Sequence, residues 1–234
     1  MLLLSSVTGC AFVEVDVHPP DKDAWGKAFS STAGRGREVI LVAPFGDVRV
    51  HDRCGMQKNG WNMDTADVKC RVNPRQWFPD ALALELTRSG FKVLRADAVP
   101  GPSTVVVRGV VEQAFFEPVD KFFTRAVEGD FGATLTVTTL SGLKAERRFF
   151  VKGTEEGLAS TEGTFQTAAD DATKKLAKHM VIALTELLDR YPALGAPEAS
   201  GATRTSRAPT TPNGAPSALG RVSMIEPSLL RVTP

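Results

Sequence analysis

The residues of this chain with the most distinctive chemistry are its three cysteines, Cys10, Cys54 and Cys70. A thiol can pair in a disulfide, bind a metal or carry a covalently attached group. Cys10 follows a short apolar stretch near the start of the chain, whereas the other two cysteines lie in a polar segment. This difference in context predicts that Cys10 and the later pair have different roles.

The first ten residues, MLLLSSVTGC, end in a motif that resembles a bacterial lipobox: an apolar run, small residues and a cysteine. In lipoproteins of that kind the resemblance implies cleavage before the cysteine, which then carries the lipid. A secretory signal needs a basic start and an apolar core of roughly 7–15 residues, and residues 1–9 contain no Lys or Arg. We interpret residues 1–10 as a lipoprotein signal-like segment whose start is truncated. The alternative is an ordinary cytosolic N-terminus with a chance motif.

Setting Cys10 aside leaves an even number of cysteines, which in an exported protein predicts a disulfide between Cys54 and Cys70. Closing a loop of about 15 residues stabilises a fold by roughly 3 kcal/mol in the chain-entropy model. Two free thiols are the cytosolic alternative. A zinc site with His51 as the third ligand is a further alternative, although it lacks the paired C-x-x-C spacing of zinc sites. We therefore predict a disulfide, no metal and no cofactor.

Catalytic patterns are sparse in this sequence. His51 and Cys54 form a candidate base–nucleophile pair, but a disulfide at Cys54 would remove the thiol. No G-x-S-x-G, Walker or G-x-G-x-x-G pattern occurs. Two acidic pairs, Glu155-Glu156 and Asp170-Asp171, fit a polar loop and the start of a helix, where carboxylates favour the helix dipole. The sequence predicts a protein that is not an enzyme.

The net charge of +1 gives no electrostatic reason to expect binding to nucleic acid. No apolar run approaches the roughly 20 residues that span a bilayer. Any attachment to a membrane would therefore pass through lipid on Cys10, and stable anchoring takes more than one acyl chain or added contacts.

Residues 11–37 are rich in Pro, Gly, Ser and charged residues, apart from a short alternating stretch, FVEVDV. We interpret them as a flexible tether, which as a coil of about 27 residues would span roughly 28 Å. At the other end of the chain, residues 192–234 are rich in Ala, Pro, Thr, Ser and Gly and predict a disordered tail. Apolar residues at 224–230 leave a docking peptide as the alternative at its end.

Residues 38–191 carry the patterns of one α+β domain. The run EVILVA at 38–43 predicts a buried central strand, and residues 104–116, 129–140 and 144–152 predict an antiparallel meander. Apolar residues at helical spacing predict helices at 79–89 and 168–190. We expect a mixed or antiparallel sheet of about five strands packed on these two helices.

Trp61 is the one large aromatic residue between the two later cysteines. A Trp in a stapled segment usually packs on the core, and the alternative is an exposed side chain that contacts a partner. We retain Trp61 as a candidate partner contact.

The order of these motifs resembles the YajG-like family of bacterial lipoproteins. The resemblance covers residues 38–191 and the N-terminus, and it rests on VTGC, EVILVA, CGMQKNGWNMDTADVKC, LALELTRSGFKVL, VVVRGVV and a last helix near DDATKKL. It implies no catalytic residues. The order of elements is also similar to the small α+β modules of other envelope lipoproteins and of the TolB amino-terminal domain, which dock envelope proteins.

From these features we expect a non-enzymatic cell-envelope lipoprotein that acts as a tethered protein-binding or scaffold module. Its partners would be the membrane, through lipid on Cys10, and other envelope proteins. Ala11 is not the Asp associated with inner-membrane retention, so the resemblance favours the outer membrane, facing the periplasm. The alternative function is binding of a small apolar or peptidic ligand in a groove between sheet and helices.

Overall fold

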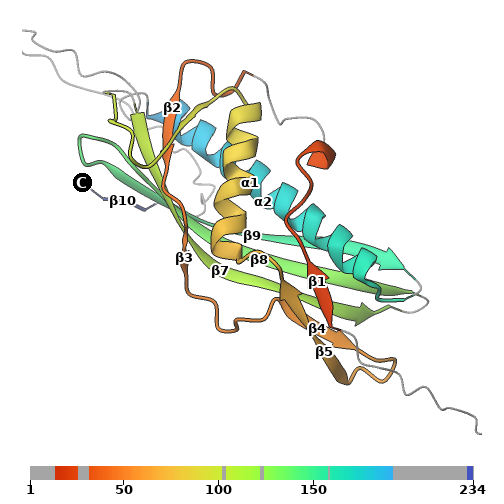
Figure 1. The fold of residues 1–234 in the computed structure, drawn as a ribbon. Helices are drawn as coiled ribbons and strands as arrows, with labels where there is room; N and C mark the ends of the chain where they lie inside the picture. The colour runs from red at the N-terminus through yellow and green to blue at the C-terminus, as the bar shows by residue number, and fades with distance from the viewer. Residues whose placement is uncertain are drawn as a thin grey trace, which may run out of the picture.

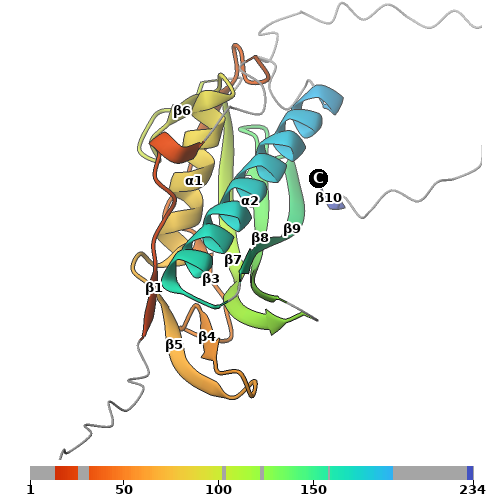
Figure 2. The ribbon, with the colours of Figure 1, turned by 90° about the vertical axis from the view of Figure 1, so that its right-hand side faces the viewer.

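The computed structural model describes residues 14–25, 32–101, 104–121, 124–157, 159–191 and 231–233. Cys10 and residues 192–230 of the expected tail lie outside these ranges. The described chain folds into two layers, a mixed sheet and two helices, α1 and α2, that both lie on one face of it (Figures 1 and 2). None of its helices is both long enough and apolar enough to cross a membrane.

Three long antiparallel strands form the centre of the sheet. They are β7 (Thr104–Asp120), β8 (Arg125–Thr138) and β9 (Lys144–Gly157). In β8, alternate residues from Phe131 to Val137 are buried against the helices. The meander predicted from the alternating pattern is confirmed, and β9 continues through Glu155 and Glu156, where a loop was expected.

Along the edge of β7 that does not pair with β8, three shorter strands follow one another. β2 (Glu38–Leu41), β3 (Gly46–Asp47) and β4 (Gly55–Lys58) all pair with it in parallel. Outside them lie β6 (Lys92–Leu94), which pairs with β2, and β5 (Asp64–Cys70), which pairs with β4. β2 lies between two neighbours and is buried, as its apolar run predicts.

The sheet has ten strands in the described chain, and the expectation of about five was wrong. Apart from β5, the additional strands, including β1 (Val15–Val17) and β10 (Arg231–Thr233), have two to four residues each. A segment of so few residues gives little periodic signal in the sequence, and its pairing depends on the strands beside it in the fold. β10 pairs with Lys144–Glu146 at the outer edge of β9, so the expected tail ends in a paired segment.

α1 (Pro74–Arg88) begins five residues before the predicted start at Pro79. The side chain of Asn73 caps it by accepting from the backbone N–H of Arg75 at 3.0 Å. Pro79 therefore lies inside the helix, where it cannot donate to the carbonyl of Arg75. That carbonyl instead accepts from the backbone N–H of Phe45 at 2.9 Å, which explains why the helix tolerates the proline.

α2 (Glu162–Arg190) begins six residues before the predicted start at Ala168. Its capping box is formed by Thr161 and Thr164, whereas Thr167 and Asp170 lie inside the helix. The predicted apolar stripe, from Ala169 to Leu188, is buried on the sheet. The start was predicted too late because Thr161–Thr164 and Thr167–Asp170 have the same spacing of three residues, and only the tertiary fold distinguishes the two candidate caps.

The N-terminal segment does not form a tether where the structure describes it. β1 pairs in parallel with β5, and Val15 and Val17 are buried. The segment then turns through the short helix η1 (Asp23–Trp25), where the buried indole N–H of Trp25 donates to Glu85 of α1 at 2.7 Å. Burial of three large side chains stabilises this polar-rich segment on the domain, which its composition did not predict.

An aromatic cluster fills the centre of the core between sheet and helices. Phe131 of β8 has ring centroids 4.8, 5.3 and 5.6 Å from those of Phe78, Phe116 and Trp77. These rings come from β7, β8 and α1, so the cluster ties the first helix to the meander.

Candidate functional site

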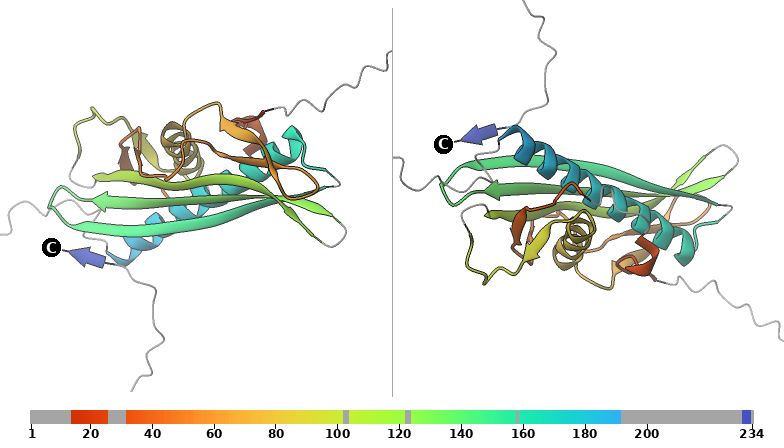
Figure 3. Two further views of the ribbon diagram at one scale, coloured as in Figure 1. Left: turned by 90° about the horizontal axis from the view of Figure 1, so that it is seen from below. Right: turned by 90° about the horizontal axis from the view of Figure 1, so that it is seen from above.

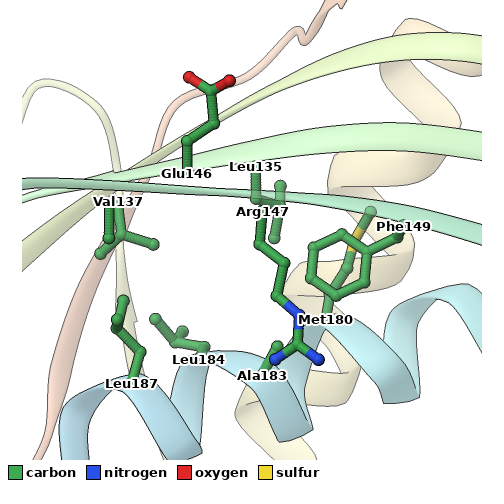
Figure 4. A pocket seen from close by; sticks show the side chains of 10 residues that line it. Leu135, Val137, Glu146, Arg147, Phe149, Met180, Ala183, Leu184 and Leu187 are labelled. Atoms are coloured by element: carbon green, nitrogen blue, oxygen red, sulfur yellow. The ribbon is translucent and has the colours of Figure 1, made fainter. Parts of the chain in front are cut away.

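A narrow apolar groove runs between the second half of α2 and the strands β8 and β9 (Figure 4). Strand residues form one wall and helix residues the other, chiefly Leu135, Val137 and Phe149 opposite Met180, Ala183 and Leu187. The cavity measures about 20 Å³, which is space for roughly one water molecule. Pockets for small organic ligands usually measure about 300–1,000 Å³, so this groove does not favour a small-molecule site.

Arg147 of β9 covers part of the groove. Its guanidinium group pairs with Glu186 of α2 at 3.2 Å and lies 5.7 Å from the ring centroid of Phe149. Figure 4 shows this side chain reaching toward the helix, while the neighbouring Glu146 points away from it. Alternate residues of β9 therefore face opposite sides of the sheet.

The face of the sheet that points away from α1 and α2 is the second surface of interest (Figure 3). Glu112 of β7 pairs with Arg148 of β9 across Thr134 of the central strand, from which it also accepts a hydrogen bond of 2.6 Å. Lys152 of β9 pairs with Glu128 of β8 at 2.5 Å. We name this surface, which is not covered by helices, the open face.

Apolar side chains lie among these ion pairs on the open face. Phe150 of β9 is opposite Gly132 of β8 and is 57% exposed. On the far side of Gly132, β7 has a bulge between Val111 and Gln113. Beside the bulge is an open depression of about 380 Å³, lined by residues that include Arg49, Val50, His51, Gln113 and Phe115.

Asp130 of β8 is a carboxyl on the open face with a shifted pKa. It lies between Phe115 and Lys152 in the cross-strand register, and its Oδ1 is buried with no hydrogen-bond partner. Burial raises the pKa of Asp130 above its ordinary value, and the ammonium of Lys152, 3.7 Å away, partly opposes that rise.

The hairpin of β4 and β5 carries the two later cysteines and Trp61. Cys54 and Cys70 form a disulfide with a Cα–Cα distance of 5.6 Å, as predicted from the even cysteine count. The pairing removes both thiols from the alternative zinc site and from the candidate pair with His51. Among the described residues, no group of three or more His, Cys, Asp and Glu side chains is placed to hold a metal ion.

The turn of this hairpin presents an ordered apolar tip. The Asn59 side-chain oxygen accepts from the backbone N–H groups of Trp61 and Met63 at 2.9 and 3.1 Å. Arg125 of β8 donates to the carbonyl of Asn59 at 2.9 Å and holds the turn from outside. Trp61 is 84% exposed and Met63 is 57% exposed, so the expectation that Trp61 packs on the core was wrong.

The candidate residues predicted from the sequence do not come together in one site. Cys54, Cys70 and Trp61 share one hairpin, His51 lies near Phe115 with ring centroids 6.3 Å apart, and Cys10 lies outside the described residues. Sequence reasoning missed Phe150, although two adjacent phenylalanines in a strand must face opposite sides of the sheet. It also missed Asp130, for which the sequence carries no signal.

No protein-family model and no curated protein sequence matches the chain. Its fold is similar to that of a Xanthomonas campestris protein of the family DUF330, with a TM-score of 0.50 at 12% identity over 76% of this chain and 98% of that one. Weaker neighbours include a minor lipoprotein from Acinetobacter baumannii, with a TM-score of 0.33 at 9% identity over 67% of this chain and 94% of that one. Another is a lipoprotein from Neisseria meningitidis, with a TM-score of 0.30 at 12% identity over 66% of this chain and 99% of that one. The first comparison establishes a shared fold, and bacterial lipoproteins are among the structural neighbours.

Proposed function

We propose that this protein is a cell-envelope lipoprotein that carries lipid on Cys10 and acts without catalysis as a tethered protein-binding module. The lipobox-like motif before Cys10 and the disulfide of the β4–β5 hairpin support export, because disulfides persist in oxidising compartments. The absence of Asp at position 11 favours the outer membrane, with the domain in the periplasm. The more specific relationship to the YajG-like family rests on the order of the sequence motifs.

The observation that carries the binding role is the open face. Protein interfaces combine an apolar centre, often with aromatic residues and Arg, with a polar rim. The open face has this composition, because the exposed ring of Phe150 lies among the charged pairs Arg148–Glu112 and Lys152–Glu128. A second envelope protein with an apolar side chain above Gly132 and charges that complement the rim fits this surface.

The small-ligand alternative has less support. It requires a cavity between sheet and helices, and the groove there has a volume of about 20 Å³ beneath Arg147.

The anchor is tested by fractionating the native cell envelope with and without the Cys10→Ala substitution. The unsubstituted protein should be recovered with membranes, and mass spectrometry should find lipid on an N-terminal Cys10. The Cys10→Ala protein should leave the membrane fraction. An intact N-terminal peptide with an unmodified Cys10 would contradict the proposal.

The binding face is tested by crosslinking in intact envelopes, followed by purification of the protein under denaturing conditions. Phe150→Glu should abolish the crosslinked species, because it places a charge at the apolar centre of the open face. Leu140→Glu is the matched control, since Leu140 is similarly exposed (54%) but lies in the turn between β8 and β9. Equal crosslinking of both variants would exclude the open face, and recovery of the protein alone would count against a scaffold role.

A further inference from the structure

The packed N-terminal segment limits how far the domain can lie from Cys10. Glu14 is the first described residue, its carboxylate pairs with Lys69 of β5 at 2.8 Å, and β1 follows directly. Only three residues lie between Cys10 and Glu14, and each of the four steps from one Cα to the next advances an extended chain by at most about 3.6 Å. A lipid on Cys10 therefore holds Glu14 within roughly 14 Å of its attachment point.

The direction of β1 determines which end of the domain faces that attachment point. β1 is parallel to β5, with Val15 opposite Val68, and β5 begins at Asp64 next to the hairpin turn. The start of β1 is therefore on the side of the turn, and Figure 2 shows β1, β4 and β5 together at one end of the molecule. Four strand residues from Val68 back to Asp64 cover about 13 Å, which matches the reach of the chain between Cys10 and Glu14.

The turn at this end exposes apolar side chains on a rigid backbone. Trp61 and Met63 are the large apolar residues that it exposes, and the hydrogen bonds of Asn59 fix their backbone. The disulfide closes the base of the hairpin, and Arg125 holds the turn against the meander. Exposing these side chains therefore requires no local unfolding.

The cations around the turn are already paired within the domain. Lys58 pairs with Glu117 at 2.8 Å, and Arg125 pairs with Asp120 at 3.2 Å. Contact with a surface at this end would therefore depend on apolar side chains more than on attraction to anionic headgroups.

We propose that the β4–β5 turn rests in the headgroup region of the membrane that holds the lipid of Cys10, with Trp61 and Met63 as the contacting side chains. Trp prefers this region because its ring is apolar and its N–H remains hydrated. The contact supplies an attachment besides the acyl chains, and it orients the domain with the turn toward the lipid and the turn between β8 and β9 away from it. This inference rests on the proposed lipidation of Cys10.

The test uses the native full-length lipidated protein reconstituted in phosphatidylcholine vesicles, with or without bromine on the acyl chains. Trp25 and Trp77 are buried, so the exposed Trp61 is the indole that vesicle lipids can reach. Brominated lipid should quench the emission of Trp61, and Trp61→Ser should remove the quenched component. Adding anionic phosphatidylglycerol or salt should change the quenching little.

The matched control moves the exposed tryptophan to the opposite end of the meander, in the double variant Trp61→Ser/Leu140→Trp. Bromine should not quench this variant, because Leu140 lies in the turn that faces away from the membrane. Quenching of the Leu140→Trp variant, or unquenched Trp61 in protein whose Cys10 carries lipid, would overturn the orientation and leave the lipid anchor intact. Crosslinking of Trp61 to a protein in native envelopes would assign the turn to a partner instead. If mass spectrometry finds no lipid on Cys10, the proposed lipoprotein function is wrong, independently of where the turn lies.

Discussion

At the scale of single residues, Asp130 of β8 has a carboxylate in an unfavourable environment. Its carboxylate is partly buried on the open face between an aromatic ring and Lys152, and one oxygen has no hydrogen-bond partner. Burial disfavours the charged form, so the pKa of Asp130 in the folded protein lies above 3.8.

A pH dependence follows from the direction of that shift. The folded state binds the Asp130 proton more tightly than the unfolded state does, so the stabilising contribution is present below pH 3.8 and is lost as pH rises through the raised pKa. Asp130→Asn removes the charge and should increase the free energy of unfolding at pH 7. Its advantage should shrink as the pH is lowered to about 3.8 and below.

Urea unfolding at several pH values measures this difference. Asp64→Asn, at an exposed carboxyl on β5, is the control and should change stability by less than about 0.5 kcal/mol. If Asp130→Asn is less stable than the unsubstituted protein at pH 7, the ion pair with Lys152 outweighs burial and the assignment is wrong.

At the scale of elements, the contact between α2 and β9 depends on a glycine. A Cβ added at Gly153 would lie 2.2 Å from the carbonyl oxygen of Ala168 and 2.6 Å from the backbone nitrogen of Ala172. These are backbone atoms of the helix, which cannot move without shifting the whole element. Gly153 therefore sets the distance at which α2 crosses the sheet edge.

Gly153→Ala should destabilise the protein by about 1–3 kcal/mol, which is the usual cost of overpacking a core. Gly157→Ala in the same strand is the control, because its nearest contact, to the carbonyl oxygen of Ala159, would be an ordinary 3.4 Å. Thermal unfolding followed by circular dichroism compares the two variants. Equal unfolding midpoints for Gly153→Ala and Gly157→Ala would contradict this, because they would show that α2 can move away from β9 without loss of stability.

The helix and the strand edge are also joined by polar contacts near this crossing. Asp171 accepts from the backbone N–H of Thr154 at 3.3 Å, and Lys175 donates to the carbonyl of Lys152 at 3.1 Å. Unpaired edge groups invite pairing with other chains. The side chains of Asp171 and Lys175 satisfy part of that edge.

At the scale of the whole molecule, the N-terminal segment contacts three other elements of the domain. β1 pairs with β5, the side chain of Gln166 in α2 accepts from the backbone N–H of His18 at 2.9 Å, and Trp25 bonds to Glu85 in α1. The domain is therefore not suspended on a coil of about 27 residues, and any lipid on Cys10 holds it close to the bilayer.

Hydrogen exchange tests this arrangement. The backbone amides of His18 and Arg71 donate to Gln166 and to the carbonyl of Val17, so both should be protected. Val17→Asp should accelerate both, because burying a carboxylate at a fully buried position costs several kcal/mol. The backbone amides of β8 should stay protected in the Val17→Asp variant. Val48→Asp, at an exposed position, is the control and should change exchange at neither His18 nor Arg71.

The sequence by itself determined the elements that have a local period and the chemistry of the later cysteines. The alternation in β8 and the apolar stripes of α1 and α2 follow from spacing that a short window of sequence contains. The pairing of Cys54 with Cys70 was predicted from the even number of later cysteines. For the candidate site, the sequence pointed to the segment between Cys54 and Cys70 and to Trp61. It favoured burial of the Trp61 side chain, which the structure exposes. Local patterns do not say which face of an element another element will cover.

Only the tertiary structure decided the features that depend on a partner distant in sequence. The N–H of Phe45 lets Pro79 lie inside α1, β7 orders the short strands, and β5 binds the polar-rich segment that was expected to be a tether. The exposure of Trp61 is of this kind too, because it follows from how β4, β5 and β8 hold the turn. In each case the deciding free energy comes from burial or hydrogen bonding across the fold, which no local propensity contains.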